Sequence, residues 1–308
     1  MTPKGVEEKP SESALIAALR RTIACQEYQG KRFGQDYLAE VFLPFSYRFL
    51  LKFNQIRANT KAKLDALFPG MTEFIIARTV YFDGLFAAAL MERTPQIVLL
   101  GAGYDSRACR FAKLNDGTKI YELDIAPTQE RKKQCLKRAN IQVRRQVKFV
   151  PIDFNRESLQ DVLERAGWQP QQETLFIWEG VTYYLLPEAV EAVLEFISRA
   201  AQKDSTIAFD YSIPLTEDNW NDYYGAKEFV HSMREYQANE AILFSIGEGE
   251  IESYLAQQNL RLIEHLDNNE IERKYLINDD ETLIGKIPGH LRFVIAAPII
   301  LEQTTMRS

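Results

Sequence analysis

The chain has 308 residues, a hydrophobic fraction of 46%, and 37 Lys and Arg against 43 Asp and Glu, for a formal net charge of −6. This composition supplies enough apolar side chain for a folded core and excludes a chain that is mainly disordered, collagen-like or of low complexity. Three cysteines without a Cys-x-x-Cys pair argue against a disulfide framework and a cysteine-based zinc site, so we expect a cytoplasmic protein.

The first part of the chain predicts a helical cap subdomain over residues 1–70. Apolar residues recur at helical spacing in residues 13–28, 36–53 and 56–67, and Pro69 with Gly70 ends the pattern. No stretch of signal-peptide type is present, and the apolar segment 41–53 is too short to cross a bilayer. The isoelectric point of about 5.4 gives little support for a nucleic-acid groove. We therefore expect neither a membrane nor a nucleic acid as partner.

Residues 71–308 predict a second unit of α/β class. After a helix over 72–91, short apolar runs alternate with longer amphipathic segments, a pattern typical of a parallel sheet with crossover helices. The predicted strands are 96–100, 119–123, 147–151, 175–178, 205–210, 260–266 and 291–297, and the predicted helices are 106–114, 127–139, 159–166, 187–201 and 248–258. A Tyr- and Glu-rich insertion at 216–244 follows the fifth strand and is expected to form a lid over the carboxyl ends of the strands, where such sheets bind ligands.

The segment VLLGAGYDSRACRF, residues 98–111, carries a strand through two glycines directly into a helix. Gly101 and Gly103 allow a tight turn and the close approach of a ligand, and the following helix offers unpaired N–H groups to a negative group. Both nucleotide and S-adenosylmethionine sites use this geometry, but the third glycine of a dinucleotide fingerprint is replaced by Ser106, which disfavours a pyrophosphate. The alternative is a tight turn that binds no ligand.

Acidic residues recur where the predicted strands end, at Asp124, Asp153, Glu179 and Asp210. Asp124 lies 21 positions after Gly103, a spacing that suits a carboxylate accepting hydrogen bonds from both hydroxyls of a ribose. Asp153 and the following Phe154 would suit an adenine amino group and an adenine ring. Asp124 could instead cap a helix, and the same alternative applies to Asp210.

Four ordered strings resemble the leucine carboxyl methyltransferase family of class I S-adenosylmethionine-dependent methyltransferases. They are ARTVYFDG at 77–84, VLLGAGYDSRACRF at 98–111, YELDIAP at 121–127 and FIWEGVTYYLLPEAV at 176–190. The chain is more similar to the family's bacterial branch of O-methyltransferases of polyketide and other secondary metabolism. The resemblance covers residues 72–213 well. It implies a Rossmann-like, seven-stranded, mostly parallel sheet flanked by helices.

The resemblance also implies roles for individual residues. The cofactor, S-adenosyl-L-methionine, and its product S-adenosyl-L-homocysteine would be held by Arg78 at the methionine carboxylate, with Glu179 near the amino end. Gly101, Gly103, Asp124, Asp153 and Phe154 match the glycine loop, the ribose carboxylate and the adenine pair. On the acceptor side we expect Tyr184 and Tyr211, with core packing as the alternative. His231 in the insertion, or Asp210, is the candidate base.

We expect an O-methyltransferase that acts on a hydroxyl or carboxyl oxygen of a small molecule with a polyketide or acyl chain. The alternatives are a protein C-terminal carboxyl methyltransferase and a noncatalytic nucleotide-binding protein. No His, Cys or carboxylate cluster has the spacing of metal ligands, so no metal is expected. The oligomeric state is left open by the sequence.

Overall fold

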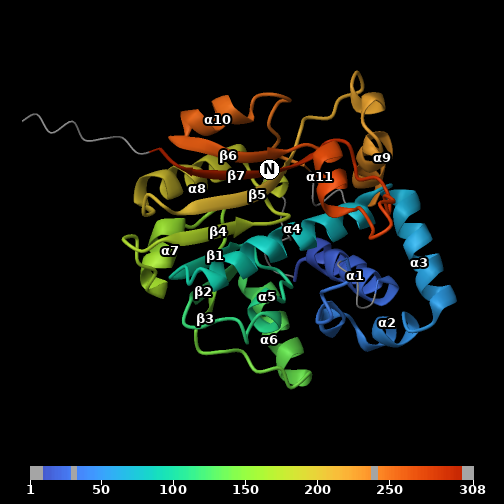
Figure 1. Cartoon of the computed structure of the whole chain (residues 1–308), viewed down its shortest axis with the longest axis horizontal. Helices are drawn as coiled ribbons and strands as arrows, with labels where there is room; N and C mark the ends of the chain where they lie inside the picture. Colours follow the sequence, from blue (N-terminus) through green and yellow to red (C-terminus); the bar gives the residue numbers. More distant parts are fainter. Residues whose placement is uncertain (1–9, 29–32, 237–241, 300–308) are drawn as a thin grey trace, which may run out of the picture.

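The computed structural model describes residues 10–28, 33–236 and 242–299, and its centre is one seven-stranded sheet in the order β3-β2-β1-β4-β5-β7-β6 (Figure 1). Strands β1 to β5 pair in parallel, whereas β7 runs antiparallel to both β5 and β6. The strands are β1 (Gln96–Leu100), β2 (Lys119–Asp124), β3 (Val147–Pro151), β4 (Thr174–Trp178), β5 (Thr206–Ser212), β6 (Leu260–Leu266) and β7 (Leu291–Pro298). This is the predicted class I methyltransferase-like α/β fold. The direction of strand addition reverses between β1 and β4, which makes their carboxyl ends a ligand-binding edge.

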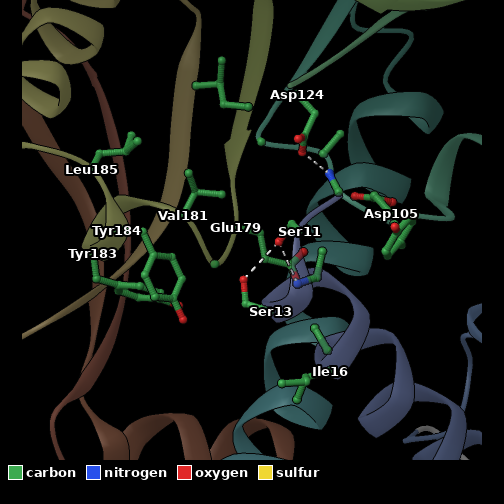
Figure 2. Close-up of a pocket in the computed structure, with 18 of the residues that line it drawn as sticks. Ser11, Ser13, Ile16, Asp105, Asp124, Glu179, Val181, Tyr183, Tyr184 and Leu185 are labelled. Atoms are coloured by element: carbon green, nitrogen blue, oxygen red, sulfur yellow. Dashed lines mark hydrogen bonds between the residues drawn. The ribbon is translucent and has the colours of Figure 1, made fainter. Parts of the chain in front are cut away.

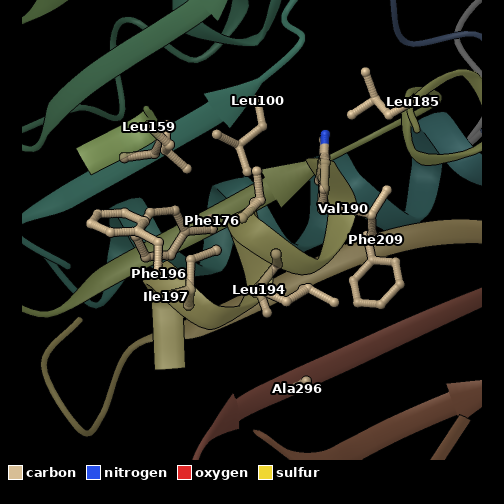
Figure 3. Close-up of a cluster of buried hydrophobic side chains, with 14 of the residues drawn as sticks. Leu100, Leu159, Phe176, Leu185, Val190, Leu194, Phe196, Ile197, Phe209 and Ala296 are labelled. Atoms are coloured by element: carbon tan, nitrogen blue, oxygen red, sulfur yellow. The ribbon is translucent and has the colours of Figure 1, made fainter. Parts of the chain in front are cut away.

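Helices cover both faces of the sheet. The first face carries α7 (Leu159–Ala166), α8 (Pro187–Ala200) and α10 (Ile251–Gln257), and the second carries α4 (Met71–Met91), α5 (Arg107–Arg110) and α11 (Asn268–Tyr275). On α8, buried apolar residues recur every three or four positions, and Val190, Leu194 and Ile197 pack with Phe176 and Phe209 of the sheet (Figure 3). The amphipathic spacing therefore decides which side of each helix faces the strands.

The N-terminal helices differ in one place from the sequence expectation. The structure has α1 (Glu12–Glu27), a short 3₁₀ turn η1 (Ala39–Phe42), α2 (Phe45–Leu50) and α3 (Asn54–Leu67). A single helix over 36–53 was wrong because Pro44 lies at its centre, where a missing N–H and a bulky ring break a helix, and α2 starts after it. α1 and η1 share an apolar cluster with α6 (Ala126–Arg138). The division of the chain at residue 70 stays a prediction, and its residues 1–9 and 29–32 lie outside the described part.

Two features follow β5. The expected insertion at 216–244 contains a 3₁₀ turn η3 (Trp220–Asp222) and α9 (Ala226–Tyr236), while its residues 237–241 lie outside the described part. Helix α11 was missed, although Asp267 and Glu270 form a capping box in which each side chain accepts from the other's backbone N–H. That sequence signal was available before the structure.

Helix α4 runs through the centre of the molecule (Figure 1). Among the described residues it is the one helix long and apolar enough to cross a membrane by length and composition. Two thirds of its most apolar stretch, 67%, is buried inside the fold. This is the position of a core helix, and α4 delivers Arg78 to the ligand-binding edge.

Candidate active site

A cavity of about 790 Å³ opens at the carboxyl ends of β1, β2 and β4. Its floor is the glycine loop after β1, and its walls come from α1, from the start of α4, from the turn after β4 and from α9. Figure 2 shows Asp124 and Asp105 on one side of this space and Tyr183, Tyr184 and Leu185 on the other. Between them lie Ser11, which caps α1, and the α1 residues Ser13 and Ile16. Segments that are far apart in the chain thus meet at the edge where ligands bind.

The glycine loop has the backbone that its sequence predicts. Gly101 and Gly103 both have positive φ, 68° and 44°, a region that residues with a Cβ rarely adopt. A Cβ on Gly101 would lie 2.4 Å from Cγ2 of Val181, and one on Gly103 would lie 3.2 Å from Cβ of Ala14. Because α1 lies directly against the loop, the loop and the N-terminal helix are packed as one surface.

Asp124 is held beside this loop by two backbone donors. Gly103 N donates to Asp124 Oδ2 at 2.6 Å, and Ile125 N donates to Oδ1 at 2.7 Å. Burial raises the pKa of this carboxyl to about 6, although both backbone N–H groups act in the opposite direction. The carboxylate lines the cavity and keeps acceptor capacity for further donors, as the ribose assignment requires.

Asp153 and Phe154, the predicted base-binding pair, both line the cavity after β3. Asp153 Oδ1 accepts from Asn155 N at 3.0 Å, which holds the carboxylate in the turn. The Phe154 ring packs against Trp178, with ring centroids 6.3 Å apart. The two side chains therefore present one acceptor and one aromatic ring to the cavity.

Arg78 and Glu179 form an ion pair at the centre of the site. Arg78 Nε donates to Glu179 Oε1 at 3.0 Å, and Arg107 Nη1 lies 2.7 Å from Glu179 Oε2. Burial alone would lower the pKa of Arg78, but Tyr183, Asp210 and Glu179 together raise it above its ordinary value. Both side chains line the cavity, so a fixed cation and a fixed anion stand side by side there.

Asp210 has a supporting position and does not line the cavity. Its Oδ1 accepts from Gly180 N at 2.6 Å, and its Oδ2 accepts from Tyr183 OH at 2.7 Å and from Arg78 Nη1 at 3.1 Å. The alternative of Asp210 as the base is therefore not supported, since its oxygens are taken up in orienting Arg78 and Tyr183. Burial raises the pKa of Asp210, against the opposing effect of Arg78.

The two tyrosines expected on the acceptor side separate in the structure. Tyr184 lines the cavity, with its ring edge-on to Tyr183 at 5.1 Å between centroids. Tyr211 is 1% exposed, is not a lining residue, and its hydroxyl lies 3.1 Å from His265 Nε2. Tyr211 therefore packs in the core, which was the alternative to a role on the acceptor side. Alternate residues of β5 point to opposite faces of the sheet, so its place near the end of the strand did not decide which way its side chain points.

His231 is also placed away from the cavity. It is exposed on α9 and contacts Trp220, at 5.5 Å between ring centroids. Phe229 and Met233 of the same helix line the cavity. His231 lies two positions from each of them, so its side chain points to the opposite face of the helix. The structure therefore gives α9 a place in the wall and removes His231 as the candidate base.

The sequence predicted a helical cap over residues 1–70 but singled out none of the α1 residues that line the cavity. The adjacent Arg20 and Arg21 line it together with Ser13 and Ala17, which lie three, four, seven or eight positions before them and hence on the same side of the helix. Arg21 Nη2 donates to Tyr104 O at 2.9 Å, and Arg20 Nη1 donates to Asp65 and to Thr72. Helical spacing was a usable signal, but nothing in the sequence says which face of α1 meets the sheet edge.

Comparisons with known proteins agree with this geometry. The family model described as leucine carboxyl methyltransferase matches residues 14–198, more than half of the chain. The "Putative S-adenosyl-L-methionine-dependent methyltransferase YktD" of Bacillus subtilis strain 168 is 28% identical over 210 residues, 68% of this chain and 67% of YktD. A protein of the same description from Mycobacterium tuberculosis strain H37Ra is 35% identical over 138 residues, 45% of this chain. This chain spans 43% of that relative's length, less than two thirds.

Solved structures show the same fold. A DUF574 family protein from Streptomyces avermitilis MA-4680 superposes with a TM-score of 0.60 at 13% identity, over 95% of this chain and 99% of that one. A structure described as a "putative methyltransferase", from Thermobifida fusca YX, gives a TM-score of 0.57 at 16% identity, over 87% and 98%. The sequence matches give S-adenosyl-L-methionine as the cofactor, which confirms that prediction.

Proposed function

Since the chain belongs to the leucine carboxyl methyltransferase family, we propose that it uses S-adenosyl-L-methionine to methylate an oxygen of a small molecule with an extended apolar part. The observation that carries the proposal is one cavity in which the glycine loop with Asp124 faces an apolar wall. A secondary metabolite of polyketide or acyl type has the chemistry that such a wall accepts.

The cofactor side of the cavity fits the group that the family uses. Gly101 and Gly103 leave the backbone open to close approach because a Cβ at either position is disfavoured. Asp124 offers an acceptor to hydroxyls, Asp153 with Phe154 offers an acceptor beside an aromatic ring, and Arg78 offers a guanidinium to a carboxylate. In the proposal these residues bind the ribose, the adenine and the methionine carboxylate.

The acceptor side is apolar, and the guanidinium of Arg20 lies beside it. Its wall is formed by Phe68, Met71, Ile75, Phe229, Met233 and Leu243. Arg20 adjoins this wall, and its Nε has no hydrogen-bond partner in the described part of the chain. Burial lowers the pKa of Arg20 to about 10, so the guanidinium is charged at pH 7. An acceptor with a carboxylate and an apolar chain satisfies both features.

A carboxyl oxygen is also favoured by the shortage of a base. Among the described residues that line the cavity there is no histidine or cysteine, Glu179 and Asp105 are held by Arg78 and Arg107, and in the proposal Asp124 and Asp153 lie on the cofactor side. A carboxylate is already ionised near pH 7 and needs no proton acceptor, whereas an aliphatic hydroxyl does. We therefore assign the acceptor atom to a carboxylate oxygen.

The mechanism is then one of positioning. S-adenosyl-L-methionine supplies a methyl group activated by the positive charge on its sulfur. In the proposal Arg78, Asp124 and the glycine loop orient the cofactor at their end of the cavity. Tyr184 lines the cavity, where its hydroxyl can hold the acceptor. α1 and α9 both contribute side chains to the wall of the cavity, and in the proposal they help to hold the acceptor against the cofactor. Alignment of this kind contributes about 7 to 11 kcal/mol in well-oriented reactions.

Calorimetric titration tests the cofactor part of the proposal. S-adenosyl-L-homocysteine is expected to bind to the purified chain and NAD is not, and Asp153→Ala is expected to weaken binding about tenfold. The control is Asp218→Ala, a change at an exposed carboxylate outside the cavity. Preference for NAD would favour the noncatalytic nucleotide-binding alternative.

Methyl transfer from labelled cofactor tests the acceptor part. Long-chain carboxylic acids are expected to be labelled, and their methyl esters are not. Label in the C-terminal carboxyl of a peptide, with none in the fatty acids, would favour the protein-methylating alternative that the family name raises.

A further inference from the structure

Large apolar side chains are exposed together on residues 45–56, which include α2 and the start of α3. Of the fifteen exposed large hydrophobic residues in the described chain, six lie in these twelve positions. Phe45 is 78% exposed, and the others are between 37% and 51% exposed. The six are Phe45, Tyr47, Phe49, Leu50, Phe53 and Ile56. We call them the aromatic patch, and a patch of this kind marks a contact surface more often than chance exposure.

The aromatic patch belongs to a well-anchored segment. Phe42, Leu43 and Leu51 are buried in the cluster that α1 shares with α6. Arg57 is buried too, with its Nε 2.5 Å from Glu27 Oε1 and its Nη1 donating to Leu51 O at 3.1 Å. One side of the segment is thus fastened to the protein, and the aromatic patch is presented on the other.

The charged residues of the segment that carries the aromatic patch are all basic. Between residues 41 and 64 the chain has five basic residues and no acidic one, in a protein whose formal net charge is −6. Arg57 and Lys61 pair with acidic residues from outside this range. For the remaining three, Arg48, Lys52 and Lys63, the described part of the chain shows no ion pair. The segment therefore offers cations beside exposed aromatic rings.

We propose that residues 45–56 dock on the surface of an anionic lipid bilayer. Aromatic rings favour the level of the lipid headgroups, and Lys or Arg beside them is attracted to anionic lipid. A second copy of the chain is a poorer occupant, because a two-fold contact would bring Arg48 and Lys52 of both copies together.

This revises the expectation that no membrane is involved. That expectation concerned segments that insert into or cross a bilayer, and docking on the surface requires neither. In Figure 1 α2 and the first part of α3 lie at an outer edge of the molecule, away from the sheet. Docking there does not use the residues assigned to methyl transfer, so the two proposals stand or fall separately.

The test is co-sedimentation of the full chain with vesicles. Vesicles of phosphatidylcholine mixed with phosphatidylglycerol are expected to bind the chain, vesicles of phosphatidylcholine alone much less, and added salt should weaken binding. The double variant Phe45→Ser/Phe49→Ser removes two exposed rings without entering the core, and binding should fall about tenfold or more. Arg48→Gln/Lys52→Gln should remove the preference for the anionic lipid.

The matched control is Met91→Ser/Ile263→Ser, which changes two exposed apolar side chains outside the patch. It should bind vesicles as the unchanged chain does. For every variant, titration with S-adenosyl-L-homocysteine shows independently of the vesicles that the chain is folded and binds the cofactor product. Three results would overturn the proposal: no binding to anionic vesicles, equal binding by the Phe45→Ser/Phe49→Ser variant, or a dimer in solution that this variant converts to a monomer.

Discussion

Replacement of Asp124 by Asn should stabilise the protein near pH 7 while weakening its cofactor site. Burial raises the pKa of Asp124 from 3.8 to about 6. One pKa unit corresponds to about 1.4 kcal/mol, so keeping this carboxylate ionised in the folded chain costs up to about 3 kcal/mol. An amide removes that cost, but its single oxygen can accept from only one of Gly103 N and Ile125 N, and its NH2 group faces the other donor, a loss of about 1 to 2 kcal/mol. The expected gain in unfolding free energy at pH 7 is therefore about 1 kcal/mol.

The pH dependence distinguishes this explanation from a general packing effect. Well below pH 3.8 the carboxyl is protonated in both the folded and the unfolded chain, so its stabilising contribution is complete there and is already largely present near pH 4. That contribution is lost as the pH rises through about 6, because the pKa is raised in the folded state. The gain from Asp124→Asn should thus be absent near pH 4 and complete at pH 7.

Urea unfolding at a series of pH values measures the gain, and calorimetry with S-adenosyl-L-homocysteine measures the loss of affinity. We expect affinity to fall about 10- to 100-fold, because hydrogen bonds to a charged acceptor contribute about 1.5 to 3 kcal/mol. Asp218→Asn, at an exposed carboxylate, is the control. A destabilisation by Asp124→Asn of equal size at pH 4 and pH 7 would refute the reasoning.

Four further substitutions test the site. Gly101→Ala should lower the melting temperature and abolish measurable binding of S-adenosyl-L-homocysteine, because its Cβ would lie 2.4 Å from Val181. Gly84→Ala is the control: its Cβ meets open space, so the change should stabilise α4 by about 1 kcal/mol. Arg78→Lys should weaken binding of S-adenosyl-L-homocysteine about tenfold or more, since one ammonium cannot replace the guanidinium that reaches Glu179, Tyr183 and Asp210. The control, Arg93→Lys at the surface, should leave this binding unchanged. Tyr184→Phe should lower kcat for a carboxylic acid acceptor while calorimetry shows unchanged cofactor affinity, and a changed affinity would place Tyr184 on the cofactor side. His231→Ala should leave turnover unchanged because the side chain is exposed on the outer face of α9, and a large loss of kcat would return it to the candidate bases.

The elements of the fold were largely predictable from the chain. Period-two and period-3.6 patterns are local properties, and β1, β3, α7 and β6 have the bounds expected from them. The errors have local causes too: Pro44 breaks the predicted helix over 36–53, and the capping box that begins α11 was overlooked.

The sequence by itself also predicted the tight turn at Gly101 and Gly103, which both have positive φ, and the structure has Asp124 beside that turn. Only the tertiary structure decided which side chains reach the cavity. Tyr211 and His231 lie in plausible segments but point away from it, whereas Arg20 reaches it from a helix with no recognisable motif. Local patterns set where a residue lies along an element, and the packing of elements far apart in the chain sets what its side chain meets.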